Sequence, residues 1–117
     1  MRVDARVTPD GRAGVIVAQG EMDLAAAPRL REALTDHLTA GRAHLLMDLT
    51  AVTFIDSTGL GVLVGAAKKA GGLGGSLRIV CSNERVLRLL AITGISRSMT
   101  VLPTVEEATA NWPLSPA

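Results

Sequence analysis

The sequence predicts an α/β domain with a mixed sheet of four or five strands and four helices, in the order ββαβαβαβα. Short strand-like segments alternate with longer helical ones along the 117 residues, and this alternation is typical of right-handed crossovers between parallel strands. A short turn joins the first two strand-like segments, so that pair is expected to be an antiparallel hairpin. The length corresponds to one domain, and with 48% hydrophobic but only 2% aromatic residues the core must be aliphatic.

The chain is expected to open with the hairpin and continue into a helix. Residues 3–8 alternate apolar and polar side chains, as in a half-exposed strand, and residues 15–18 are apolar throughout. Pro9-Asp10-Gly11 between them favours a turn, because Pro fixes φ and Gly accepts a positive φ. Residues 25–39 are a predicted helix, with leucines at every fourth position on one side and charged residues and His37 on the other faces.

Two buried strands with a helix between them are predicted next. Residues 43–49 form a near-continuous apolar run, typical of a strand covered on both faces. Residues 57–70 place an apolar stripe along one helical face. The glycine-rich stretch 71–75 is interpreted as a flexible connection, since it lacks the GK[ST] ending of a phosphate-binding loop. Residues 77–81 form the next predicted strand.

The last third of the chain is expected to contain a helix, a short strand and a final helix. Asn83 and Thr104 are suitable N-caps for the two helices, which are predicted over residues 84–93 and 105–111. Residues 99–102 form the strand between them. This completes the predicted order of elements.

The predicted domain covers residues 1–112, and residues 113–117 are assigned to a flexible C-terminal tail. The segment from Trp112 to Pro116 has the composition of a frayed end. Trp112 therefore stands at the boundary of the domain, with no packing role expected for it.

The composition argues against several classes of function. The net charge is +1 and aromatic residues are scarce, so direct nucleic-acid binding is not expected. No apolar stretch approaches the ~20 residues that span a bilayer, and no secretion signal is recognisable, so the expected location is the cytoplasm. His37 and His44 are interpreted as surface and strand-end residues and Cys81 as a core residue; no metal, cofactor or disulfide is expected.

Asp56-Ser57, at the predicted start of the second helix, is the candidate functional site. In one interpretation Ser57 caps the helix, so that Ser57→Ala costs ~1 kcal/mol, and Asp56 favours the positive end of the helix dipole. In the other, Ser57 is a regulated phosphoacceptor: phosphate adds about −1.5 to −2 charges, which a helix N-terminus tolerates. Phosphorylation would then switch binding without unfolding the domain. Thr58 is a competing acceptor, and no general base or hydrolase elbow accompanies Ser57.

Gly59, Gly61 and Gly65 form a weak dinucleotide-like pattern. The preceding strand is predicted to end near Leu49, ten residues before Gly59, whereas a nucleotide fingerprint needs its first glycine close to the strand end. Nucleotide binding is therefore disfavoured. The glycines instead indicate close helix–sheet packing, a flat surface for a partner, or both. Asp23 belongs either to a solvated turn or to the same surface.

Three segments give the chain a resemblance to anti-sigma factor antagonists of the STAS family (sulphate transporter and anti-sigma antagonist). They are residues 20–24, residues 47–61 and residues 92–95, and the D-S-T-G-L-G sequence in the second is the most specific. The resemblance extends over about residues 15–110. It implies the STAS fold, a small sheet with helices, which agrees with the order of elements above.

The resemblance implies a partner-switching cycle in which the chain is a substrate and has no enzymatic activity. The unphosphorylated antagonist binds an anti-sigma factor that is also a serine kinase, which releases a sigma factor for transcription, as in stress responses. The kinase phosphorylates the serine that matches Ser57 and the complex separates; a PP2C-type phosphatase restores the binding form. The chain is expected to be a monomer or weak homodimer. The partner-binding residues implied are Asp23, Asp56, Thr58, Gly59, Leu60 and Gly61.

Two other functions remain compatible with the sequence. A STAS subunit of a lipid-transport or other multiprotein assembly would use the same helix as a docking face without phosphorylation. A small nucleotide-binding or enzymatic domain would bind nucleotide with an affinity that is lost on substitution of Gly59 or Gly61.

Overall fold

A computed structural model of the protein describes residues 1–110 and 112, and its centre is a five-stranded sheet in the order β1-β2-β3-β4-β5. The hairpin strands β1 and β2 are antiparallel, and all the other pairs are parallel. The predicted α/β class and mixed sheet are thus confirmed. The strands are β1 (Arg2–Val7), β2 (Ala13–Met22), β3 (His44–Ile55), β4 (Ser76–Val80) and β5 (Thr100–Leu102).

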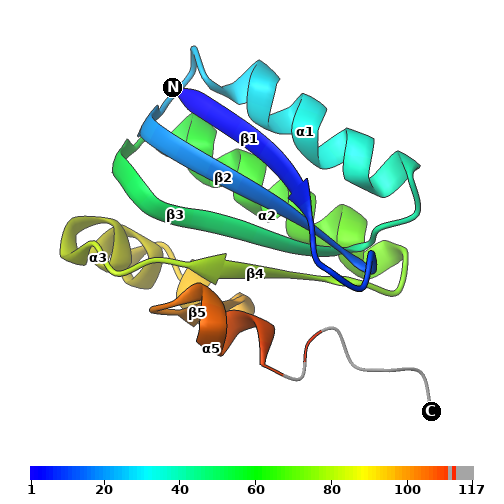
Figure 1. Ribbon diagram of the computed structural model, residues 1–117. Helices are drawn as coiled ribbons and strands as arrows, with labels where there is room; N and C mark the ends of the chain where they lie inside the picture. Colours follow the sequence, from blue (N-terminus) through cyan, green and yellow to red (C-terminus); the bar gives the residue numbers. More distant parts are fainter. Residues whose placement is uncertain (111, 113–117) are drawn as a thin grey trace.

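The helices lie on both faces of the sheet, in unequal numbers (Figure 1). Three of them bury their apolar stripes in one aliphatic core with the sheet, and α5 packs on the opposite face in a second, smaller cluster. The main core is made by α1, α2 and α3, with Ile95 of α4, whose apolar side chains meet those of β2, β3 and β4. The helices are α1 (Ala27–Thr39), α2 (Ser57–Gly72), α3 (Glu84–Ile92), α4 (Ile95–Ser98) and α5 (Val105–Thr109).

Strand β3 is longer than predicted, and a short helix was not predicted at all. The apolar run ends at Leu49, but pairing with β2 continues to Ile55, past two irregularities in the register. Because of these irregularities, Val52 and Ile55 both reach the core although they are three residues apart. The additional helix α4 begins after Gly94, whose φ of 81° suits glycine.

Trp112 is part of the fold and not of a frayed tail, so that interpretation was wrong. Its side chain is 8% exposed and packs in the smaller cluster on the α5 face. The indole Nε1–H donates to the Ser76 hydroxyl at 3.2 Å, and the Arg78 guanidinium stands 5.1 Å from the ring centroid. The ring of His44 meets the indole edge-on at 5.9 Å. The proposed tail, residues 113–117, lies outside the described residues.

His37 is buried at 3% exposure, which contradicts the predicted surface position. Its imidazole lies against Gly14, where any Cβ would overlap the ring. The Arg42 Nε–H donates to Nδ1 at 2.9 Å, so the proton of the neutral ring resides on Nε2, which has no partner within the described residues. Glycine at position 14 is what makes room for a histidine on the inner side of α1.

The free energy of unfolding is expected to fall as the pH is lowered through the ordinary histidine pKa of about 6.5. Burial, and then the positive charge of Arg42, lower the pKa of His37 from its usual 6.5. Below pH 6.5, His37 therefore binds a proton more readily in the unfolded chain than in the folded protein, and the free energy of unfolding falls. Urea unfolding at several pH values measures the effect. His37→Gln, which cannot titrate, should flatten this dependence; an unchanged slope in the variant would assign it to another group.

Candidate functional site

The residues of the candidate site meet at one end of the sheet, where β2 and β3 finish side by side. Met22 and Ile55 are the last paired residues of the two parallel strands. The chain leaves β2 through Asp23 and Leu24 towards α1, and leaves β3 through Asp56 directly into α2. Parallel pairing thus brings Asp23 and Asp56 to the same edge, as the sequence analysis allowed.

Asp56, and not Ser57, caps α2. Its Oδ1 accepts the Gly59 N–H at 2.9 Å, and its Oδ2 accepts the Leu24 N–H at 3.2 Å. The carboxylate therefore closes the first turn of α2 and ties that turn to the loop after β2. The predicted cap loss of ~1 kcal/mol for Ser57→Ala is consequently wrong, because Ser57 makes no capping bond. The sequence could not distinguish the two, since Asp and Ser are equally good caps.

Ser57 is the first residue of α2, and its side chain is exposed. No hydrogen bond within the described residues involves its hydroxyl. The backbone N–H groups of Ser57 and Thr58 lie in the first turn, where a helix offers no acceptor, and Asp56 takes only that of Gly59. The hydroxyl therefore stands at a helix start with two backbone donors still available beside it.

Asp23 serves the turn before α1. Its Oδ1 accepts the Ala26 N–H at 3.1 Å, and its backbone carbonyl accepts from Ala26 and Ala27 at 3.1 Å. These bonds explain why α1 begins at Ala27, two residues later than predicted. The half-buried side chain of Asp23 has a structural role in this turn, and the next residue, Leu24, donates its N–H to Asp56.

The glycines of α2 divide into two kinds. A Cβ on Gly59 would overlap the Met22 carbonyl oxygen and lie 3.1 Å from Cγ2 of Ile55. At Gly61 and Gly65 a Cβ would meet no atom within 4 Å. Gly59 thus permits close packing of the helix on the sheet. Gly61 and Gly65 leave an open surface on α2 that faces α1, and its use by a partner stays a prediction.

The glycine pattern argues against nucleotide binding for a different reason than the sequence suggested. β3 ends at Ile55, four residues before Gly59, so the predicted ten-residue gap was wrong. Gly59 is buried against the backbone of Met22 and presents no backbone to a phosphate. The position of the first glycine therefore disfavours a dinucleotide site even with the strand so near.

Two exposed apolar side chains at the site were missed by the sequence analysis. The Leu24 side chain is 71% exposed, and the backbone N–H of the same residue donates to Asp56. The Phe54 side chain, near the end of β3, is 49% exposed. Leu60, in the first turn of α2, is half-buried. Large apolar groups left in water around a polar centre are typical of a contact surface for another protein. In the sequence, the only indication of this surface was that Leu24 follows Asp23 in a predicted loop, where a large apolar side chain is not expected to be buried.

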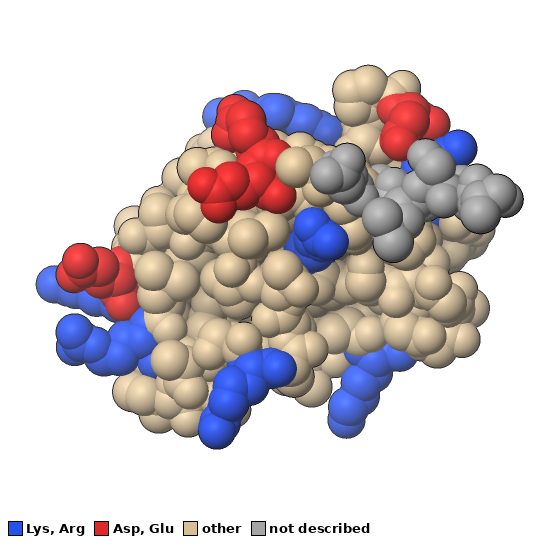
Figure 2. All heavy atoms as spheres, turned by 90° about the horizontal axis from the view of Figure 1, so that it is seen from below, with Lys and Arg blue, Asp and Glu red and all other residues tan. Residues whose placement is uncertain are grey.

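Three carboxylates, those of Glu21, Asp23 and Asp56, lie near this end of the sheet. Within the described residues none of them forms an ion pair, although Arg29 lines the same hollow as Glu21 and Asp23. Seen from below Figure 1, where β5 and α5 lie, basic side chains stand apart around a broad area of other residues (Figure 2). That face carries no continuous basic surface.

Other kinds of site are not evident in the described part of the chain. Residues 1–110 and 112 contain no group of three or more His, Cys, Asp or Glu side chains placed to hold a metal ion. Among the helices of the same residues, none has the length and apolar character to cross a membrane. The arrangement is that of a small α/β domain with an exposed hydroxyl at a helix start, at the end of the sheet that carries exposed apolar side chains.

Comparison with known proteins identifies the family. Residues 3–108 match the STAS domain, so the chain belongs to the STAS domain family. The anti-sigma-B factor antagonist of Bacillus subtilis (strain 168) is 46% identical over 76 residues, which cover 65% of this chain and 69% of that protein. Its counterpart in Listeria monocytogenes is 41% identical over 81 residues, covering 69% and 71%. The structure of an anti-sigma factor antagonist from Mycobacterium paratuberculosis superposes with a TM-score of 0.79 at 27% identity, covering 92% of this chain and 91% of that one.

Proposed function

We propose that the protein is an anti-sigma factor antagonist, which binds an anti-sigma factor and thereby releases a sigma factor for transcription. The two bacterial relatives are named for this function, and they are 46% and 41% identical over 65% and 69% of the chain. We further propose that the anti-sigma factor is a serine kinase, that it phosphorylates Ser57, and that a PP2C-type phosphatase removes the phosphate. The chain itself is the substrate in this cycle.

One observation supports Ser57 as the switch above all others: its side chain makes no contact on which the fold depends. The neighbouring residues Asp56 and Gly59 hold the helix start together. Ser57 is exposed and free to enter a kinase active site. Modification of this residue can therefore change the surface without removing a bond from the structure.

The phosphorylation step is an ordinary phosphoryl transfer. The Ser57 Oγ attacks the γ-phosphorus of ATP, the bond from that phosphorus to the β–γ bridging oxygen breaks, and ADP leaves. The hydroxyl proton passes to a base on the kinase, because no side chain in the described residues is hydrogen-bonded to Ser57. The product is accommodated here because the free N–H groups of Ser57 and Thr58 and the helix dipole favour a negative group.

The phosphate would act on the complex and not on the fold. A partner that covers the exposed Leu24 would also come close to Ser57, because the Leu24 N–H is bonded to Asp56, the residue just before Ser57. The phosphate adds about −1.5 to −2 charges directly after the Asp56 carboxylate, at the edge of the sheet that also carries Asp23. Desolvating that charge in an interface is costly, and the complex separates.

Capture experiments with three forms of the protein test the proposal. Wild type, Ser57→Ala and Ser57→Asp are used as bait, and bound proteins are identified by mass spectrometry. Wild type and Ser57→Ala are expected to retain an anti-sigma factor, and Ser57→Asp to lose it. The captured anti-sigma factor, purified and supplied with radiolabelled ATP, should transfer one phosphate to wild type and none to Ser57→Ala.

A matched control separates the position of the charge from its presence. Ser98→Asp adds the same charge on α4, just before β5, towards the opposite end of the parallel strands. It should bind the anti-sigma factor like wild type. Phosphorylation and dissociation of Ser57→Ala would show that the acceptor is a different residue. Equal capture of a transporter ATPase by all three baits would instead favour the unphosphorylated assembly subunit.

A further inference from the structure

Among the described residues, no strand pairs with the outer edge of β1. The ladder with β2 shows which backbone groups of β1 point outward. The Thr8 N–H donates to the Ala13 carbonyl at 3.0 Å, just beyond the paired residues Val7 and Gly14. In an antiparallel ladder every second residue bonds to the same neighbour, so the even-numbered residues of β1 bond to β2. The N–H and C=O groups that point away from the sheet are those of Val3, Ala5 and Val7.

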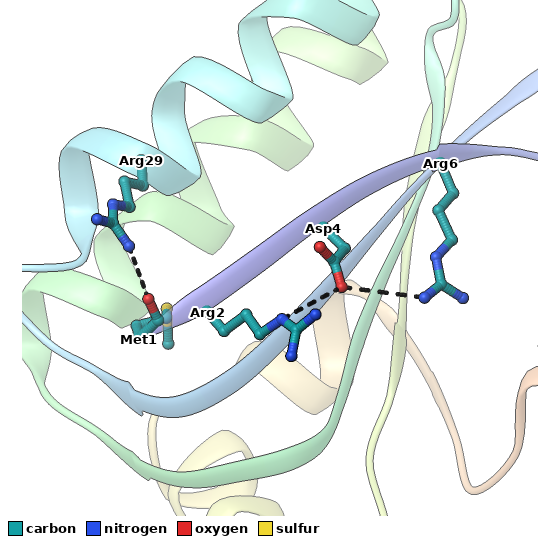
Figure 3. Close-up of polar contacts among 5 residues, drawn as sticks. All are labelled: Met1, Arg2, Asp4, Arg6 and Arg29. Atoms are coloured by element: carbon teal, nitrogen blue, oxygen red, sulfur yellow. Dashed lines mark hydrogen bonds and ion pairs between the residues drawn. The ribbon is translucent and has the colours of Figure 1, made fainter.

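The side chains of β1 alternate in charge along one face. The Asp4 Oδ2 lies 3.8 Å from Nε of Arg2 and 3.9 Å from Nη2 of Arg6, so one carboxylate stands between two guanidinium groups (Figure 3). On the other face Val3 packs against the main core, while Val7 is 45% exposed. The edge thus combines open backbone groups, an ordered charge pattern and an uncovered valine.

We propose that β1 pairs with β1 of a second copy of this chain, antiparallel and with the two-fold axis at Ala5. In this register Ala5 faces Ala5, and Val3 of each copy faces Val7 of the other. All three outward residues then form hydrogen-bonded pairs, about six backbone bonds in total. Asp4 of each copy lies opposite Arg6 of the other, in the closer, non-hydrogen-bonded type of pair.

The charge pattern selects this register over its neighbours. A two-fold axis at Asp4 would place Asp4 opposite Asp4 and Arg2 opposite Arg6, and like charges directly opposite are destabilising. An axis at Val3 would leave the outward groups of Val7 unpaired and would engage Met1, whose carbonyl already accepts from Arg29 at 2.8 Å (Figure 3). The same surface must fit itself in a two-fold contact, and the Ala5 register meets that requirement.

Sedimentation over a series of concentrations tests the proposal. The mass of wild type is expected to rise from 12.1 kDa towards that of the dimer as the concentration increases. Ala5→Pro removes an outward N–H that β2 does not use, a position at which proline is tolerated in edge strands. This variant should remain monomeric throughout, with an unchanged circular dichroism spectrum. Wild type that stays monomeric at every concentration overturns the proposal, as does Ala5→Pro that dimerises normally.

Charge-exchange variants test the register independently of the proline. Asp4→Arg places like charges opposite each other twice in the dimer and should weaken association at least ~10-fold. The double variant Asp4→Arg, Arg6→Asp restores opposite charges and should recover the wild-type affinity. Failure of the double variant to recover, in protein that is folded, contradicts the Ala5 register. Ser57→Asp should associate like wild type, so failure of this proposal and failure of the proposed function are distinguishable.

Discussion

Gly59→Ala is expected to destabilise the protein by about 2–3 kcal/mol, although alanine is the better helix former. The new Cβ would overlap the Met22 carbonyl oxygen, and Ile55 closes the space beside it. The carbonyl cannot simply move aside, because it also accepts the Asp56 N–H at 3.3 Å. The helix start would have to shift away from the sheet, which disturbs the Asp56 bonds as well. Urea unfolding followed by circular dichroism measures the loss.

Gly61→Ala is the matched control in the same helix. Its Cβ would meet no atom within 4 Å, so only the helix propensity changes, and stability should rise by about 0.5–1 kcal/mol. Stability changes of opposite sign for the two substitutions, only two residues apart, would show that packing against Met22, and not helix propensity, requires glycine at position 59. A stabilising effect of Gly59→Ala would contradict the close approach of helix and sheet.

Trp112→Ala is expected to destabilise the protein by about 3–5 kcal/mol. The substitution empties the centre of the cluster on the α5 face and removes the indole bond to Ser76. Arg78, whose Nη1 donates to the Ala108 carbonyl at 2.9 Å, would lose the aromatic ring that it covers. The loss of stability can be measured by thermal or urea unfolding with circular dichroism.

Trp112→Phe supplies the control for this prediction. It keeps an aromatic ring in the cluster but deletes the Nε1–H, so its effect should be clearly smaller than that of alanine. Trp112 is the single tryptophan of the chain, and its fluorescence in the wild type should therefore report unfolding of the α5 face. A loss below about 1 kcal/mol for Trp112→Ala would mean that the indole is not a structural support.

Much of the architecture could be predicted because local patterns carry it. The apolar periodicity of α1 and α2, the Pro9-Asp10-Gly11 turn and the capping residues each act within a few positions of the chain. Asn83 accepts from Arg85 and Val86, and Thr104 accepts from Glu107, as expected for N-caps. The same local signals locate Asp56-Ser57 at a helix start, and the D-S-T-G-L-G segment carries the family resemblance.

The features that could not be predicted depend on neighbours distant in sequence. β3 continues beyond its apolar run because β2 pairs with it as far as Ile55. His37 is inside because Gly14, on another element, leaves space for its ring. Trp112 is buried because Ser76 and Arg78 lie beneath α5. In each case the deciding neighbour lies on another element, so the outcome depends on how the strands and helices assemble.

The sequence by itself determined the class of fold, the family and the position of a hydroxyl at a helix start, because periodicity and caps are local properties. Only the tertiary structure decided what each residue of the candidate site does. Asp56 caps α2 through the Gly59 N–H, and its second oxygen accepts the Leu24 N–H from the loop after β2. Ser57 therefore has no capping role, and its side chain is exposed beside the backbone N–H groups of the first turn of α2. The different roles of Asp56 and Ser57 depend on β2 and β3 ending side by side at Met22 and Ile55, and no local sequence pattern predicts that pairing.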